Sequence, residues 1–363
     1  MAARTFPCGQ CGAALAYAPG SSSLRCGHCG SDTPIPTGSG AVPERDLHTV
    51  IESQERAAAA IACRTLPCPG CGAQVTLAAD RTSAPCPWCG GALAATDAAT
   101  TIRRPDGVLP FAVERPRAQA ALAAWVRSRW FAPTAFVAIA GPERLRPVWL
   151  PAWTVDAATR SAYTGERGDD YRVQETRQVM EQGKMVTKQV TVTRTRWTSV
   201  SGTVTRSFDD ILVPAPRTLP TDRARALEPW PLDRLVPFDD AFLAGTETET
   251  PGLAASAAFV QARAVMDAAI RSDVTAAIGG DHQRIHGIDT GIHDPTTKQV
   301  LLPVWAAGYR HRGKTYTVLV NAVTGEVQGE RPWSAAKIIL TVAVIGAAAA
   351  AVIAAYAAAA APG

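Results

Sequence analysis

The pattern of apolar and polar positions divides this chain of 363 residues into three parts. Up to residue 97, short apolar runs are broken every few positions by Cys, Gly and Pro, which is typical of small turn-rich domains. The central part alternates segments of strand-like and helix-like period. The last part is one continuous apolar run from Ile338 to Ala361.

Within the central part, the same order of elements is predicted twice. A strand-like segment, Val108–Val113, precedes a helix-like segment, Pro116–Phe131, which has Pro at its start and one apolar face. Leu235–Phe238 resembles that first strand and precedes a longer helical segment, Leu253–Ile278. Each helix is followed by a Pro-Val-Trp sequence and hairpin-like segments. We therefore predict a duplicated strand–helix–hairpin unit and an α+β body with an antiparallel sheet.

A polar segment, residues 172–206, interrupts the first copy. Its stretch Gln189–Trp197 alternates polar with apolar or β-branched positions, and Gly183 marks a turn, so we predict a long two-stranded β-arm. Seven basic and two acidic residues, seven minus two, give this arm a net charge of +5. Four interpretations stay open: contact with anionic lipid headgroups, with an acidic partner, or with nucleic acid, or a solvated hairpin whose charges only deter edge aggregation.

Eight of the nine cysteines form two units of identical spacing, offset by 60 residues. Each unit holds two Cys-x-x-Cys pairs, each followed by Gly, with fourteen residues between the second cysteine of one pair and the first of the next, a spacing typical of four-cysteine zinc sites. Four thiolates leave no open coordination position, so we predict two structural Zn²⁺ ions. A disulfide scaffold is disfavoured because no secretory signal precedes the first cysteine. The predicted metal ligands are Cys8, Cys11, Cys26 and Cys29 in the first unit and Cys68, Cys71, Cys86 and Cys89 in the second.

The apolar run at the end of the chain predicts a transmembrane helix. Ile338–Ala361 contains no charged residue, and its 24 residues would cover about 36 Å as a helix, more than the roughly 30 Å of a hydrocarbon core. Arg331, Trp333 and Lys337 precede it, as expected at a cytoplasmic interface. We predict a single-pass tail anchor in the cell membrane with everything before it in the cytoplasm. A buried Ala-rich helix is the alternative.

The charge of the cysteine-rich part indicates which class of partner it binds. Residues 1–97 contain six arginines, no lysine and seven acidic residues. Nucleic-acid affinity depends on clustered Lys and Arg, so binding of nucleic acid by this part is disfavoured, and protein recognition is the better interpretation. Trp88 lies inside a knuckle, where it would either anchor a partner or pack across its own small domain.

Two motifs suggest enzymes and are interpreted otherwise. Gly308–Thr315 matches the P-loop pattern, but a β-rich run follows where a phosphate-binding loop needs a helix, so we predict a hairpin turn and no bound nucleotide. His282 and His286 have the spacing of a zinc-protease helix without its glutamate, and the glycines around them favour a loop and strand. We therefore assign no catalytic or cofactor-binding residue, and we predict that the protein is not an enzyme.

Several phrases along the chain, together with the cysteine units and the terminal helix, resemble a bacterial tandem zinc-ribbon membrane protein family. Its members are often described as primosomal protein N′ (replication factor Y)-like or as transcription-factor-IIB-type zinc ribbon proteins. The primosomal description implies a DNA helicase, but no helicase ATPase core fits this sequence, so that activity is not carried over. The phrases are Leu150–Thr154, Tyr163–Asp169, Leu227–Trp230, Gly279–Arg284, Leu302–Trp305 and Gly329–Ser334.

The sequence thus predicts six segments and a binding function. The function predicted is a non-catalytic, membrane-anchored zinc-ribbon scaffold that recruits a cytoplasmic protein through its ribbons. The alternatives are a membrane-localised nucleic-acid-binding protein and a metal-dependent hydrolase centred on His282 and His286. The segments are zinc ribbon 1 (1–38), a helical linker (39–63), zinc ribbon 2 (64–97), a first α+β repeat that contains the β-arm (98–216), a second repeat (217–332) and the anchor (333–363).

Overall fold

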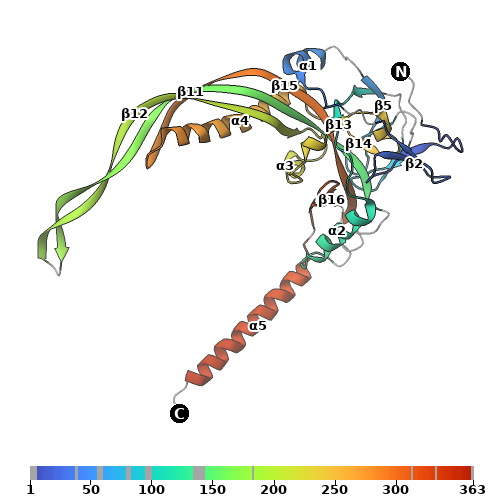
Figure 1. Ribbon diagram of the computed structural model, residues 1–363. Coiled ribbons are helices and arrows are strands. Elements are labelled where there is room, and N and C mark those ends of the chain that lie inside the picture. Colours follow the sequence, from blue (N-terminus) through green and yellow to red (C-terminus); the bar gives the residue numbers. More distant parts are fainter. Residues whose placement is uncertain are drawn as a thin grey trace.

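The α+β architecture with antiparallel sheets is confirmed by a computed structural model (Figure 1). A long twisted sheet forms the spine, the two cysteine units lie at one end of it, and an apolar helix leaves from the body. The structure describes residues 6–36, 40–54, 60–78, 83–94, 100–133, 144–181, 184–311, 314–331 and 333–360.

The spine of the main sheet is built from two hairpins. Strands β11 (Arg146–Glu181) and β12 (Lys184–Pro214) form the longer one, and β15 (His282–His311) and β16 (Lys314–Asn321) form the other. Strand β15 pairs antiparallel with β11 from Ala306 opposite Arg146 to His282 opposite Gly168. Five short strands complete this region: β4 (Arg45–Asp46), β10 (Gly107–Val108), β13 (Val236–Pro237), β14 (Glu247–Glu249) and β17 (Val327–Gly329).

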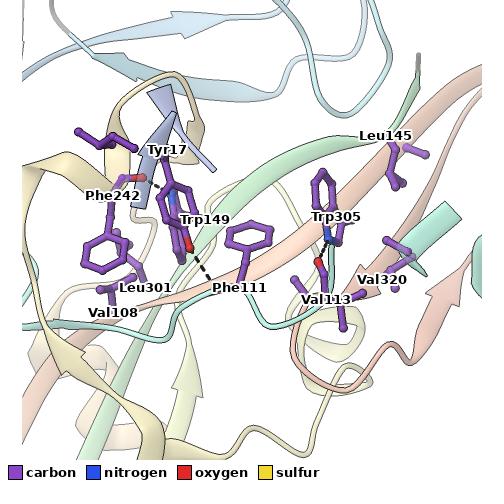
Figure 2. Packing of buried hydrophobic residues seen from close by; sticks show 14 of the residues in the cluster. Tyr17, Val108, Phe111, Val113, Leu145, Trp149, Phe242, Leu301, Trp305 and Val320 are labelled. Atoms are coloured by element: carbon purple, nitrogen blue, oxygen red, sulfur yellow. Dashed lines mark hydrogen bonds between the residues drawn. The ribbon is translucent and has the colours of Figure 1, made fainter. Parts of the chain in front are cut away.

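The pairing register sets the two Pro-Val-Trp sequences against each other. Val148 lies opposite Val304, Pro147 lies opposite Trp305 and Trp149 lies opposite Pro303. A duplicated unit with an internal two-fold axis would give this register, and the duplication itself stays a prediction. Each tryptophan bonds to a segment of the other predicted repeat. The Nε1 of Trp149 donates to the Phe242 carbonyl at 3.1 Å, and the Nε1 of Trp305 donates to the Val113 carbonyl at 2.8 Å (Figure 2).

The helices cover parts of this sheet. Helix α2 (Arg115–Arg127), with Pro in its first turn, lies against β16 and β17, and α4 (Ala255–Ile278) lies against β11, β12 and β15. Helix α4 buries every fourth residue from Ala258 to Ile278, which is the period of one helical face. The shorter helices are α1 (Leu47–Gln54), α3 (Thr221–Arg225), η3 (Leu232–Arg234) and η4 (Asp240–Leu243).

The two cysteine units join the body in different ways. Ribbon 1 forms its own sheet of β1 (Leu15–Tyr17), β2 (Ser23–Cys26) and β3 (Asp32–Pro34). Ribbon 2 continues the main sheet, because β6 (Gln74–Ala78) pairs with β14, and β5 (Ala60–Pro67) pairs with β6 and with β9 (Thr100–Arg103). Its strands β7 (Ser83–Pro85) and β8 (Ala92–Ala94) pair only with each other among the described residues.

Two predicted elements differ from the structure, and part of a third is not described. The helical linker is shorter than predicted, because helix α1 ends at Gln54 and residues 60–63 belong to β5, whose β-branched residues suit a strand. The strand predicted at Val108–Val113 is also shorter, because β10 covers only Gly107–Val108. The tip of the β-arm, residues 182–183, lies outside the described residues.

Both ribbons contribute to the buried core. Tyr17 of ribbon 1 packs against Phe111, Trp149 and Phe242, with ring centroids 5.5–5.9 Å apart, and its hydroxyl accepts a hydrogen bond from the Phe111 backbone (Figure 2). A second buried cluster holds Trp88 of ribbon 2 together with residues of β11, β15 and β16. A third lies under α4. The ribbons are therefore parts of the core and not appendages.

Candidate metal centres and membrane segment

The first metal centre is assembled from two tight turns of ribbon 1. The Sγ atoms of Cys8, Cys11, Cys26 and Cys29 all lie within 4.8 Å of one another. In each turn a glycine N–H donates a hydrogen bond to the carbonyl of the first cysteine. The Gly12 N–H donates to Cys8 at 2.9 Å, and the Gly30 N–H donates to Cys26 at 3.0 Å. Both glycines have a positive φ, which explains why glycine follows each second cysteine.

A serine supports this centre. The Oγ of Ser31 lies 3.1 Å from the Sγ of both Cys8 and Cys29. Its hydrogen bond lowers the pKa of Cys8 to about 6 and also lowers the pKa of Cys29. A lowered pKa favours the thiolate, which is the form that binds a metal. The cysteine spacing did not predict Ser31, and its only sequence signal is its position directly after the Cys-Gly of the second knuckle.

The second centre has the same knuckles but lies inside the body. The Sγ atoms of Cys68, Cys71, Cys86 and Cys89 lie within 4.8 Å of one another, and three of these residues are buried. The Gly91 backbone N–H donates to the Cys89 Sγ at 3.4 Å, at the position that Ser31 holds in ribbon 1. The two centres are therefore alike in ligands and differ in their exposure.

Trp88 fixes ribbon 2 onto the sheet. Its side chain is 4% exposed, and its carbonyl accepts a hydrogen bond from the Thr317 hydroxyl of β16 at 3.3 Å. A Cβ added to Gly308 of β15 would lie 1.8 Å from that carbonyl oxygen, so only glycine permits this approach. The prediction that Trp88 is exposed and binds a partner is therefore wrong. The alternative, packing within its own small domain, describes only part of the contact, because Trp88 is buried between ribbon 2 and the main sheet.

The donor sets fit a structural zinc ion. Four sulfur atoms in tetrahedral reach of one another suit Zn²⁺ and leave no position for water or substrate. None of the nine cysteines forms a disulfide. Both observations agree with two closed metal centres, and the identity of the ion as zinc stays a prediction.

One further group of acidic residues gathers on the main sheet. Oxygen atoms of Glu44, Asp156 and Asp209 lie within 4.8 Å of one another. The Lys298 Nζ lies 3.2 Å from Glu44 Oε1 and 2.7 Å from Oδ1 of the neighbouring Asp210, so an ammonium group offsets part of this negative charge. Burial raises the pKa of Asp156 to about 6. We interpret this group as a structural ion-pair network.

The motifs that suggested enzymes lie in strands. The Nε2 of His282 lies 3.2 Å from the Asp170 Oδ2, and the Nε2 of His286 lies 3.8 Å from the Glu166 Oε2. Among the described residues, no group of three or more metal-ligand side chains includes a histidine. Residues i and i+4 of a strand lie about 13 Å apart, too far to share an ion. Lys314, in the P-loop match, opens strand β16, so no helix follows it there.

The candidate membrane segment is helix α5 (Ala335–Ala360), whose residues Ala335–Ala354 are long and apolar enough to cross a membrane. This window is not buried against the rest of the described chain. Its first turn is bonded to the segment after α2: the Ser334 N–H donates to the Phe131 carbonyl at 2.8 Å, and the Lys337 Nζ donates to the carbonyls of Trp130 and Ala132 at 3.1 and 2.8 Å. These contacts hold the start of α5 against the segment after α2.

Aromatic and basic residues surround the start of α5. Trp130 is 71% exposed and Trp333 61% exposed, and cationic groups of Lys337 and Arg331 lie 5.8 and 4.3 Å from their rings. Such a belt is typical of a membrane–water interface. The sequence pointed to Trp333, but Trp130 lies some two hundred residues earlier and joins the belt only through the fold.

Comparison with known proteins adds one similarity. The chain is 24% identical over 236 residues to the uncharacterized protein YdjG of Bacillus subtilis (strain 168). The match covers 64% of this chain and 65% of YdjG, slightly less than two thirds of that relative's length. No protein-family model and no solved structure matches the chain. The resemblance to a zinc-ribbon membrane family therefore stays a prediction.

Proposed function

We propose that this protein is a non-catalytic scaffold, held in the cell membrane by α5 with the preceding residues in the cytoplasm, and stabilised by two structural Zn²⁺ ions. The chain's two closed four-sulfur centres support a structural use of the metal, because they offer no position for chemistry. The exposed apolar helix and its aromatic and basic belt support the anchor.

The partner site that we propose is the exposed pair of knuckles on ribbon 1. Residues 9–12 and 27–30 are all exposed, whereas the matching knuckle of ribbon 2 buries Pro87, Trp88 and Cys89. This difference between two units of equal cysteine spacing carries the proposal: ribbon 2 uses its second knuckle to contact the sheet, whereas ribbon 1 presents both of its knuckles to solvent. Gln10 and His28 stand at the exposed tips of the two turns. The low charge of this part favours a protein over nucleic acid.

Affinity purification of the full chain from detergent-solubilised membranes tests the partner site. The wild type is compared with a Gln10→Ala/His28→Ala variant, which keeps every cysteine, and zinc is quantified in both. We expect a protein partner that survives nuclease treatment, binds the wild type and is lost from the variant, with zinc content unchanged. Loss of the partner on nuclease treatment would favour the nucleic-acid alternative, and equal binding by both chains would exclude the ribbon 1 knuckles. Resistance of the chain to carbonate extraction from membranes tests the anchor separately.

A further inference from the structure

The longer hairpin continues past the helix that covers it. Strand β15 pairs with β11 only as far as Gly168, so among the described residues 169–181 of β11 and 184–196 of β12, here called the distal hairpin, pair only with each other. A Cβ added to Gly165 would lie 3.0 Å from Cδ1 of Ile278, the last residue of α4, so the cover that α4 provides stops just before the distal hairpin begins. Figure 1 shows α4 under the arch of the sheet and the hairpin running on beyond it.

The contacts of α4 identify which face of the hairpin it covers. Val200, Val204 and Phe208 of β12 pack against the buried cluster that contains the residues of α4. Because successive residues of a strand point to opposite faces, the even-numbered residues of β12 up to Phe208, with their partners on β11, form the face toward α4. The pairing of β11 with β12 has no irregularity beyond Ala157, so this face, here called the α4-side face, continues into the distal hairpin.

An apolar patch lies on the α4-side face of the distal hairpin. Val173 lies directly opposite Val192, and both are partly exposed. Tyr171 and Val190, in the two neighbouring pairs, are 38% and 36% exposed. A two-stranded hairpin is marginally stable in water unless a further layer covers its apolar face, and the described residues leave this patch exposed. Over the same length, the opposite face is polar and holds Arg172, Gln174, Thr176, Gln189, Thr191 and Thr193.

The charge around the patch is positive. Within residues 167–177 and 188–198, the α4-side face carries five basic and two acidic residues, five minus two, a net charge of +3. Both acidic residues already bond to arginines of this face. Arg196 has no carboxylate partner among the described residues, and its guanidinium carbon lies 5.1 Å from the centroid of the Tyr171 ring. The charged residues of this face are Arg167, Arg177, Lys188, Arg194 and Arg196, with Asp169 and Glu175.

Helix α4 shows what kind of element this face accommodates. One residue in four of α4 is buried from Ala258 to Ile278, and its Asp273 Oδ1 lies 2.9 Å from Nη1 of Arg206, which belongs to the α4-side face. An apolar stripe with a carboxylate beside it therefore fits the valines and arginines of this face. The distal hairpin repeats that combination without a helix of its own. Its residues 169–177 span about 27 Å, the length of a helix of about 18 residues.

We infer that the distal hairpin docks an acidic amphipathic helix of a partner protein, which extends the layer that α4 begins. Its apolar side packs on Tyr171 and the three valines, and its carboxylates pair with Arg196 and the neighbouring basic residues. Nucleic acid would match the charge but not the valines, which offer no surface for base stacking. The pairing of Arg206 with Asp273 favours a helix over a lipid surface. This surface is separate from the ribbon 1 knuckles, so the inference goes beyond the proposed partner site and does not depend on it.

The test uses the full chain in phosphatidylcholine nanodiscs and a fluorescent 18-residue peptide. The peptide has leucines along one side of a helix and glutamates beside them. Two control peptides have the same composition in scrambled order, or lysine in place of each glutamate. Binding is measured by fluorescence anisotropy, with empty nanodiscs as the background. We expect the first peptide to bind more tightly than both controls and its affinity to fall with added salt.

Matched variants locate the contact. Val192→Thr and Arg196→Gln change the α4-side face and keep a residue that suits a strand or a solvent-exposed position, whereas Arg172→Gln removes an exposed charge from the opposite face. The first two should each weaken binding of the first peptide about fivefold, and Arg172→Gln should leave it unchanged. Equal zinc content and melting temperature in the three variants show that the chain stays folded. Gln10→Ala/His28→Ala should bind the peptide as the wild type does, which separates this surface from the ribbon 1 site.

Three results would overturn the inference. One is failure of the first peptide to bind, or equal binding of the scrambled peptide. Another is an equal effect of Arg196→Gln and Arg172→Gln, which would indicate attraction by net charge alone. The third is tighter binding of a DNA oligonucleotide or of phosphatidylglycerol vesicles than of the peptide, weakened by Arg196→Gln, which would assign the face to nucleic acid or to lipid.

Discussion

At the scale of single residues, the most unusual side chain in the body is a buried carboxyl group. Glu249 of β14 is 1% exposed, and its Oε1 accepts hydrogen bonds from the backbone of Thr218 and Leu219 at 2.5 and 3.0 Å. Its Oε2 has no hydrogen-bond partner among the described residues. Burial raises the pKa of Glu249 to about 7. This residue therefore keeps its proton to a higher pH than an exposed glutamate does.

The raised pKa predicts a stability that falls with rising pH. Between the ordinary value of 4.5 and about 7 the folded chain binds more protons at Glu249 than the unfolded chain, so its free energy of unfolding decreases through this window, by at most about 3 kcal/mol. Glu249→Gln keeps the accepting oxygen and removes the charge. We expect the variant to be more stable than the wild type at pH 8 and similar at pH 5, by urea unfolding followed by tryptophan fluorescence. Glu52→Gln, at an exposed position, is the control, and an equal pH slope in all three chains would contradict the prediction.

The ligand residues of the two metal centres were accessible from the sequence, whereas their surroundings were not. Two cysteines and a glycine within five positions determine a knuckle locally, so spacing alone predicted which eight cysteines gather. Ser31, Trp88 and Trp130 depend on contacts between distant segments. Trp88 has the same local sequence signal whether it faces a partner or the sheet, and only its contact with Gly308 decides between the two.

At the scale of elements, the close approach of ribbon 2 to β15 predicts a sharp difference between two glycines of that strand. The Cβ of Gly308→Ala would meet the Trp88 carbonyl, which is backbone and cannot rotate away, so we expect a loss of about 1–3 kcal/mol in the free energy of unfolding. The Cβ of Gly287→Ala would find its nearest neighbour, the Thr164 hydroxyl oxygen, at 3.7 Å, so this variant is the matched control. Thermal unfolding and zinc content are measured for both. Equal melting temperatures would mean that ribbon 2 is not held against Gly308.

The sequence predicted elements better than their pairing. The helices after Pro116 and Leu253 were predicted from their apolar period, and both hairpins from alternation and turn residues. That ribbon 2 continues the main sheet depends on β14, three residues long, which pairs with β11 on one side and β6 on the other. Such a short segment has no period to detect, so the joining of residues 60–78 to the body could not be predicted.

At the scale of the whole molecule, both cysteine units share buried clusters with the body, so we expect the three to unfold together. Ribbon 1 contributes Tyr17 to the aromatic core around Trp149. Ribbon 2 contributes Trp88 to the second buried cluster and the strands β5 and β6 to the sheet itself. Structural zinc sites add about 10 kcal/mol or more to folding, which exceeds the net stability of many domains. Loss of either ion should therefore affect parts of the chain far from the cysteines.

Removal of metal consequently predicts unfolding of the body and not only of the ribbons. The metal content of the purified chain should be two Zn²⁺ per molecule, one for each four-cysteine group. Cys11→Ser and Cys71→Ser should each lose one ion, lower the melting temperature and shift the fluorescence of buried tryptophans to longer wavelength. Cys63→Ser changes a buried cysteine that belongs to neither group, and it should keep both ions. If metal loss left the tryptophan fluorescence and melting of the body unchanged, the ribbons would be independent domains, and the shared core described here would not contribute to stability.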